Sequence, residues 1–102
     1  MSHYLRVFQS QIDPADVPML RRLFEEDVRP VFAALPGCLT IELVVNVDHN
    51  AGGLVEGCVI SRWASLDDLD AALGSRGTAE AGVRLRQVLR QEPVTKVYEV
   101  IE

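Results

Sequence analysis

Residues 53–73 read GLVEGCVISRWASLDDLDAAL, a stretch that predicts a strand running directly into a helix. Val, Ile, Cys and Trp dominate residues 54–63 and favour a pleated, partly buried strand. Ser65 ends this strand and is a good helix N-cap, with Asp68 in the acidic position of a capping box. Trp63, the single tryptophan of the chain, stands at the junction. The other predicted elements can be arranged around this strand–helix unit.

The composition indicates one folded domain over residues 1–102, since 48% of the residues are hydrophobic. A net charge of −5 without a Lys/Arg cluster argues against nucleic acid and anionic membranes as partners. No apolar run is long enough to span a bilayer, and the first residues do not resemble a signal peptide, so a cytoplasmic protein is expected. Cys38 and Cys58 lack metal-ligand spacing and are expected to be free thiols.

The chain in order predicts strands that alternate with helices. The predicted strands cover Tyr4–Gln11, Leu39–Asp48, residues 54–63 and Val94–Ile101. The predicted helices run from Asp16 to about Leu35, from Ser65 to Gly74 and from Thr78 to about Gln91. This β-α-β-β-α-β order is typical of a ferredoxin-like α+β fold, with a four-stranded antiparallel sheet and the helices on one face.

Helix ends and helix faces can also be predicted. Asp16 is the better N-cap of the first helix, and Pro30 should kink that helix because it lacks an N–H group. Thr78 is expected to cap the last helix. Leu73 and Val83 are expected on or beside the inward faces of their helices.

The turn at residues 49–53 sets a register for the central hairpin, because its glycines supply the positive φ that such turns need. If Asp48 faces Leu54, Trp63 lies opposite Leu39 on the face that meets the helices. Val44 then lies opposite Cys58 on the other face, several rows from Cys38, which excludes a disulfide.

This second face of the sheet is predicted to be a homodimer interface. It would expose Val44, Cys58 and Ile60, and the helices cannot cover them because they pack on the opposite side. A contiguous apolar patch of this kind usually marks an interaction surface.

A candidate pocket for a small aromatic ligand is predicted between the sheet and the helices. Its candidate residues are Phe8, Phe24, Phe32, Ser61, Trp63 and Tyr98. Ordinary core packing remains the alternative for each aromatic side chain. The expected kink at Pro30 and the break at residues 74–77 favour a cavity, because irregular helices cover a sheet imperfectly.

Other catalytic chemistry finds little support. His3 and His49, the only imidazoles, fall in a terminus and a loop. No nucleophile has recognisable triad partners. The acidic residues 67–70 read as a capped helix start, so no metal site is predicted.

The chain resembles the antibiotic biosynthesis monooxygenase family of the dimeric α/β-barrel superfamily. The resemblance rests on the element order, on Pro36-Gly37 before the second strand and on Trp63-Ala-Ser65 at the end of the third. It implies a homodimer whose sheets face each other, and in some members cofactor-independent oxygenation of polycyclic phenols or quinols. The haem-degrading branch is not matched, because Ala71 and Ala72 stand where that branch has a second tryptophan and no histidine follows His49.

Two functions remain open at this point. The first is a cofactor-independent monooxygenase of a small aromatic or polyketide-like substrate, and the second is a non-catalytic ligand-binding or accessory dimer. A cyclase or isomerase is a third possibility, disfavoured by the lack of acid/base groups on the inner face. None of these requires a cofactor.

Overall fold

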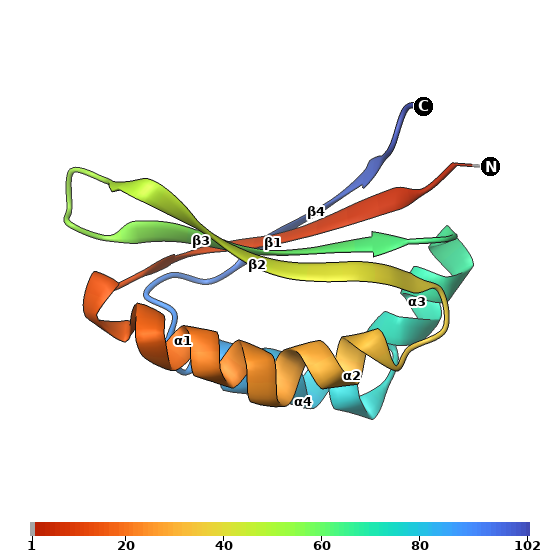
Figure 1. Ribbon diagram of the computed structural model, residues 1–102, viewed down its shortest axis with the longest axis horizontal. Coiled ribbons are helices and arrows are strands. Elements are labelled where there is room, and N and C mark those ends of the chain that lie inside the picture. The colour runs from red at the N-terminus through yellow and green to blue at the C-terminus, as the bar shows by residue number, and fades with distance from the viewer. Residues whose placement is uncertain (1) are drawn as a thin grey trace.

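The computed structural model describes residues 2–102 and places a four-stranded sheet over a layer of helices (Figure 1). The strands are β1 (Tyr4–Ile12), β2 (Cys38–His49), β3 (Val55–Trp63) and β4 (Val94–Glu99). The helices are α1 (Val17–Leu23), α2 (Arg29–Ala33), α3 (Leu66–Leu73) and α4 (Arg76–Arg86). A 3₁₀ turn, η1 (Pro14–Asp16), precedes α1, and a π-helical turn, η2 (Phe24–Val28), joins α1 to α2.

The sheet has the order β2-β3-β1-β4, with all neighbouring strands antiparallel. The helices all lie against one face, and the other face carries no element (Figure 1). The predicted ferredoxin-like α+β fold is therefore confirmed. β2 and β4 form the two edges of the sheet.

The predicted hairpin register is confirmed in the middle of β2 and β3, where Val44 faces Cys58. It is wrong at both ends of the hairpin. Cys38 and not Leu39 lies opposite Trp63, and near the turn the register shifts again, so that His49 pairs with Val55 and the predicted pairing of Asp48 with Leu54 is not kept. A β-bulge between Cys38 and Thr40 inserts Leu39 as an extra residue and leaves it 46% exposed. Gly37, at φ +82°, makes the tight turn into β2 just before this bulge.

The first helix accommodates Pro30 through η2. The N–H of Arg29 donates to the carbonyl of Phe24, five residues back, and this wider turn accommodates the irregularity that Pro30 imposes. Asp13 caps the start by accepting the Ala15 N–H at 3.0 Å, so the prediction of Asp16 as the cap is wrong. The reason is the 3₁₀ turn η1, which begins before α1.

The later helices confirm one predicted cap and correct another. Ser65 accepts the Asp68 N–H at 3.1 Å, as predicted. Ser75 caps α4 by accepting the Thr78 N–H at 3.2 Å, so α4 begins three residues earlier than its predicted Thr78 cap would allow. Val83 points outward and is 60% exposed, contrary to its predicted place beside the inward face.

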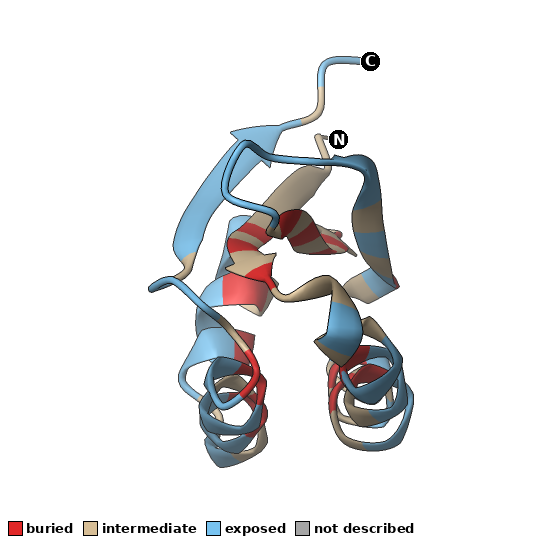
Figure 2. Ribbon diagram, turned by 90° about the vertical axis from the view of Figure 1, so that its left-hand side faces the viewer, coloured by how far each residue is buried: buried red, intermediate tan, exposed pale blue. Residues whose placement is uncertain are grey.

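The core lies between the sheet and the helices, where Figure 2 shows the buried residues gathered. Trp63 is completely buried there, as its predicted position on the helix side of β3 requires. Leu69 and Ala72 of α3 and Leu85 of α4 pack into the same cluster. Leu73 is largely exposed, contrary to its predicted inward position.

Candidate functional site

The predicted pocket residues, with the exception of Tyr98, lie together in the core. Phe8 comes from β1, Phe24 from η2 and Phe32 from α2, and all three are buried. Phe32 meets Trp63 edge to face, with ring centroids 6.4 Å apart and ring planes at 67°. The strand and helix periodicities therefore bring these side chains together as expected.

Tyr98 lies on the opposite face of the sheet, so its prediction as a pocket residue is wrong. It pairs with Leu5 of β1, which is out of phase with the buried Phe8. Tyr98 is 49% exposed. Apolar residues alternate poorly along β4, so the sequence pattern does not fix which face each residue takes.

Trp63 and Ser61 form a hydrogen-bonded pair inside the core. The indole Nε1–H donates to the Ser61 Oγ at 2.9 Å, and both residues are buried. A buried indole N–H needs such a partner. Ser61 therefore has a structural task, and Trp63 is a packed core residue.

The core leaves a cavity of about 30 Å³ beside this aromatic cluster. It is lined by Arg6, Phe8, Val28, Phe32, Val59, Thr78, Gly82 and Leu85. A second void of about 10 Å³ shares Phe8, Val59 and Leu85 with it. The cavity is far smaller than the several hundred Å³ of typical ligand pockets, so a ligand would require side chains to move.

Gly82 and η2 explain why the space lies here. Gly82 presents no side chain from the middle of α4, and Val28 belongs to the π-helical turn opposite. Turns of this kind often occur at functional sites.

Arg6 is the cavity residue that the sequence analysis did not single out. Its position in phase with Phe8 on β1 was the available signal, since it places a cation on the inner face of the sheet. The guanidinium carbon lies 5.7 Å from the centroid of the Phe8 ring. Burial, and secondarily the charge of Arg86, lower the pKa of Arg6 from its ordinary value.

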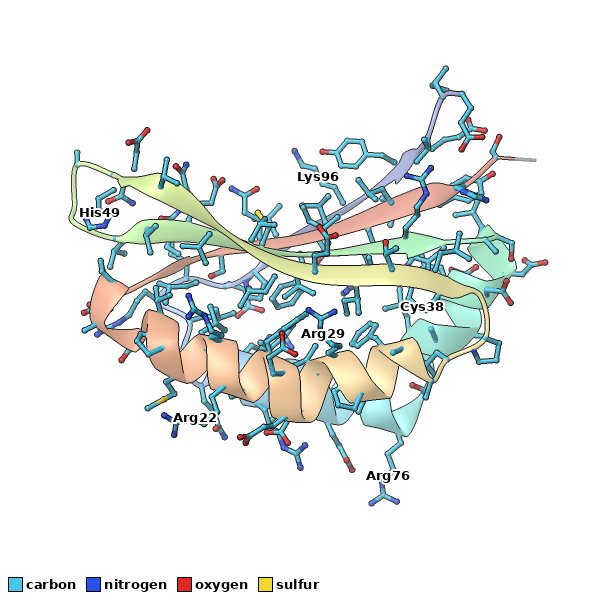
Figure 3. The ribbon with its side chains drawn as sticks, in the orientation of Figure 1. Arg22, Arg29, Cys38, His49, Arg76 and Lys96 are labelled. Carbon is cyan, nitrogen blue, oxygen red and sulfur yellow. The ribbon has the colours of Figure 1, made fainter. Side chains whose placement is uncertain are left out.

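An open groove of about 450 Å³ lies at the edge of the molecule, between α2 and β2. Arg29 lies between the helix and the sheet here (Figure 3) and donates from Nη1 to the Ile41 carbonyl at 3.0 Å. Glu25 binds the same guanidinium. The guanidinium of Arg29 already donates to Glu25 and to the Ile41 carbonyl. It is therefore less available to a ligand than the guanidinium of Arg6.

The histidines lie away from the cavity. His49 is exposed at the end of the β2–β3 hairpin (Figure 3), and His3 accepts a hydrogen bond from Arg62 at 3.2 Å. Across residues 2–102, no three His, Cys, Asp or Glu side chains are grouped so as to hold a metal ion. No helix in this range has the length and apolar character needed to cross a membrane.

Comparison with known proteins gives a family match and a set of similar folds. The model of the antibiotic biosynthesis monooxygenase family matches residues 4–84. Among curated protein sequences none matches this chain.

Three solved structures illustrate the likeness in fold. Rv0793 from Mycobacterium tuberculosis is 21% identical, with 99% of this chain and 97% of that chain covered and a TM-score of 0.72. A conserved protein from Methanosarcina mazei is 17% identical, with 96% and 92% covered and a TM-score of 0.75. SnoaB, a cofactor-independent oxygenase from Streptomyces nogalater, is 17% identical, with 100% and 94% covered and a TM-score of 0.74.

Proposed function

Because the chain belongs to the antibiotic biosynthesis monooxygenase family, we propose that it is a cofactor-independent monooxygenase of a small aromatic or polyketide-like substrate. The observation that carries this proposal is the core cavity, which has aromatic walls and a single cationic side chain. The substrate ring would lie against Phe8 and Phe32, within reach of Arg6.

The chemistry asks little of the protein beyond binding and desolvation. A phenol that loses its proton can donate electrons to O₂ directly, and its oxidation to a quinone incorporates one oxygen atom and releases the other as water. The site must orient the ring, favour loss of the proton and exclude water. A nearby, partly buried cation favours the ionised phenol over the neutral one, which is the contribution that Arg6 would make.

A second candidate is a non-catalytic ligand-binding or accessory dimer. The small size of the cavity and the complete burial of Trp63 favour it, because a closed core needs no ligand. Oxygen consumption separates the two candidates. With metal chelated, the oxygenase should consume O₂ in the presence of naphthols or hydroxylated anthracenes, at a rate above that of substrate in buffer. Ligand-induced change in Trp63 emission without O₂ uptake would establish the accessory role.

Dimerisation through the uncovered sheet face is part of the proposal. Val44, Cys58 and Ile60 lie on this face, and Ile60 pairs with Val7 of β1. Polar groups border the patch: Gln9 donates to Glu56 at 2.5 Å on one side, and Arg62 binds Glu102 at 3.2 Å on the other. An apolar centre with a polar rim is the usual anatomy of a protein interface.

The two free thiols support a reducing, cytoplasmic location, and they also report on this interface. Burial raises the pKa of both, and Glu56 raises that of Cys58 further. A raised pKa leaves less thiolate at neutral pH, so both cysteines should be alkylated more slowly than a cysteine in a short peptide. Their alkylation should become faster as the pH rises above the ordinary pKa of a thiol.

The dimer should make the two thiols react differently. Cys58 would be covered by the partner copy, whereas Cys38 lies at the start of the edge strand β2 (Figure 3). We expect iodoacetamide to modify Cys38 several-fold faster, as measured by peptide mass spectrometry over time. The Ile60→Glu variant should abolish the difference. Equal rates in the unmodified protein would contradict a dimer through this face.

A further inference from the structure

Arg6 is a cation without a counter-charge. Its Nε is the sole buried side-chain nitrogen or oxygen lacking a hydrogen-bond partner within residues 2–102. Most other arginines have a carboxylate partner: Arg29, Arg62, Arg76, Arg84, Arg86 and Arg90 each lie within 4.0 Å of one. The side chain as a whole is only partly buried, but its Nε is shielded from solvent, which makes this N–H a donor available to a ligand.

The surroundings of Arg6 carry a second positive charge and no acidic side chain in the cavity wall. None of the residues that line the cavity is acidic. Arg86 of α4 lies near enough to oppose the charge on Arg6. This local excess of positive charge occurs in a chain whose net charge is −5. An anion entering the cavity would relieve both the missing hydrogen bond and the repulsion, in a medium where charges interact more strongly than in water.

Thr78 offers a second donor on the opposite wall. Its hydroxyl lies 2.7 Å from the Ser75 hydroxyl, and either oxygen can be the donor in that contact. When Ser75 donates, the Thr78 proton is free for a ligand in the cavity that Thr78 lines. Thr78 is buried, which removes water as a competing acceptor.

We infer that the cavity selects ligands that carry a negatively charged oxygen, a carboxylate or a phenolate, on a small aromatic body. Arg6 binds the charged oxygen, Thr78 donates to the same group, and Phe8 and Phe32 contact the ring. The inference rests on the proposed function for the position of the ligand site, and it does not depend on oxygenation.

The experiment compares ligands of matched shape and different charge. 2-Naphthoate and 2-naphthamide are titrated near neutral pH, with calorimetry and Trp63 emission as readouts. We expect the anion to bind at least about tenfold more tightly, the preference of a charge-assisted hydrogen bond over a neutral one. The Arg6→Met variant should lose the preference and keep the affinity for the amide. Arg22→Met is the charge-matched control and should keep it, because Arg22 points away from the sheet (Figure 3).

A second arm identifies the charged group. 4-Nitrophenol should ionise at a lower pH when bound to the unmodified protein than when free, and at its ordinary pH with Arg6→Met, as its visible absorption reports. A shift of this kind supports phenolate recognition, and a preference for naphthoate alone supports carboxylate recognition.

Folding of the variants can be checked separately. Arg6→Met should melt no lower than the unmodified protein, because it removes a partly buried cation that has no counter-charge. If it fails to fold, Arg6→Lys carries the test, since it keeps the charge without the planar fork and should retain part of the preference.

Equal binding of naphthoate and naphthamide, binding of neither, or a preference that survives Arg6→Met would overturn the inference. The proposed oxygenase fails independently. Anion binding that depends on Arg6 without any O₂ uptake would exclude oxygenation and leave anion recognition intact. Turnover of phenols without an Arg6-dependent preference would support oxygenation and exclude anion recognition by Arg6.

Discussion

The Ile60→Glu variant is expected to be monomeric at concentrations where the unmodified protein is a dimer. In a two-fold dimer each substitution enters the interface twice, and a carboxylate desolvated against apolar side chains is not compensated. The free energy of association should fall by about 3 kcal/mol or more for a residue at the centre of an interface. This loss raises the dissociation constant by more than about 100-fold. Sedimentation velocity at micromolar concentration measures the change directly.

Arg22→Glu is the matched control for this variant. Arg22 is exposed on α1, on the side of the molecule away from the uncovered sheet face. The control should sediment as the unmodified dimer and keep its circular dichroism spectrum. A monomeric unmodified protein, or an Ile60→Glu variant that remains dimeric, would show that this face is not the interface.

Trp63→Ala should destabilise the fold by about 3–5 kcal/mol, the range for removing a large aromatic side chain from a core. The indole is completely buried, packs edge to face on Phe32 and donates its N–H to the Ser61 hydroxyl oxygen. Urea unfolding followed by far-ultraviolet circular dichroism measures the loss without relying on tryptophan emission.

Two controls separate the contributions to this loss. Trp63→Phe keeps most of the volume and the contact with Phe32, so its cost should be about half as large and reflect the lost hydrogen bond to Ser61. Val83→Ala removes apolar atoms from an exposed position and should change stability by less than about 0.5 kcal/mol. A loss below about 1 kcal/mol for Trp63→Ala would contradict its placement in the core.

The parts of the fold predicted best were those that local chemistry specifies. The alternation along β2 and β3 and the glycines of their turn were enough to pair Val44 with Cys58. The Ser65 cap followed from its place between a strand and an acidic turn. The bulge at Leu39 was not predictable in this way, because it adds a residue to one strand without changing the local pattern; it follows Gly37, whose backbone lies against Asp68 of α3.

The prediction of helix caps failed where the sequence offered two suitable residues. Asp13 and Asp16, and likewise Ser75 and Thr78, are all good capping side chains. The observed choice of Asp13 and Ser75 depends on tertiary packing, which buries Thr78 against the cavity. Propensity alone does not distinguish such pairs.

The candidate site shows the same division. Strand and helix periodicity brought Phe8, Phe32 and Trp63 together, but it did not show which of them packs solidly and which borders a void. The cavity lies beside Gly82 of α4 and Val28 of η2, and the packing of these two elements against each other could not be derived from periodicity. Arg6 was passed over because a charged residue within a strand usually reads as solvated, although its phase with Phe8 places it on the inner face of β1.

The most direct test of the proposed oxygenase is incorporation of isotopic oxygen by metal-chelated protein. The phenol of the panel that most perturbs Trp63 emission is incubated under ¹⁸O₂, and the product is reduced before mass spectrometry so that a quinone does not exchange its oxygen with water. We predict a product that carries one ¹⁸O atom and forms faster than in a buffer control. Binding of the phenol without labelled product above that control would contradict oxygenation by this protein.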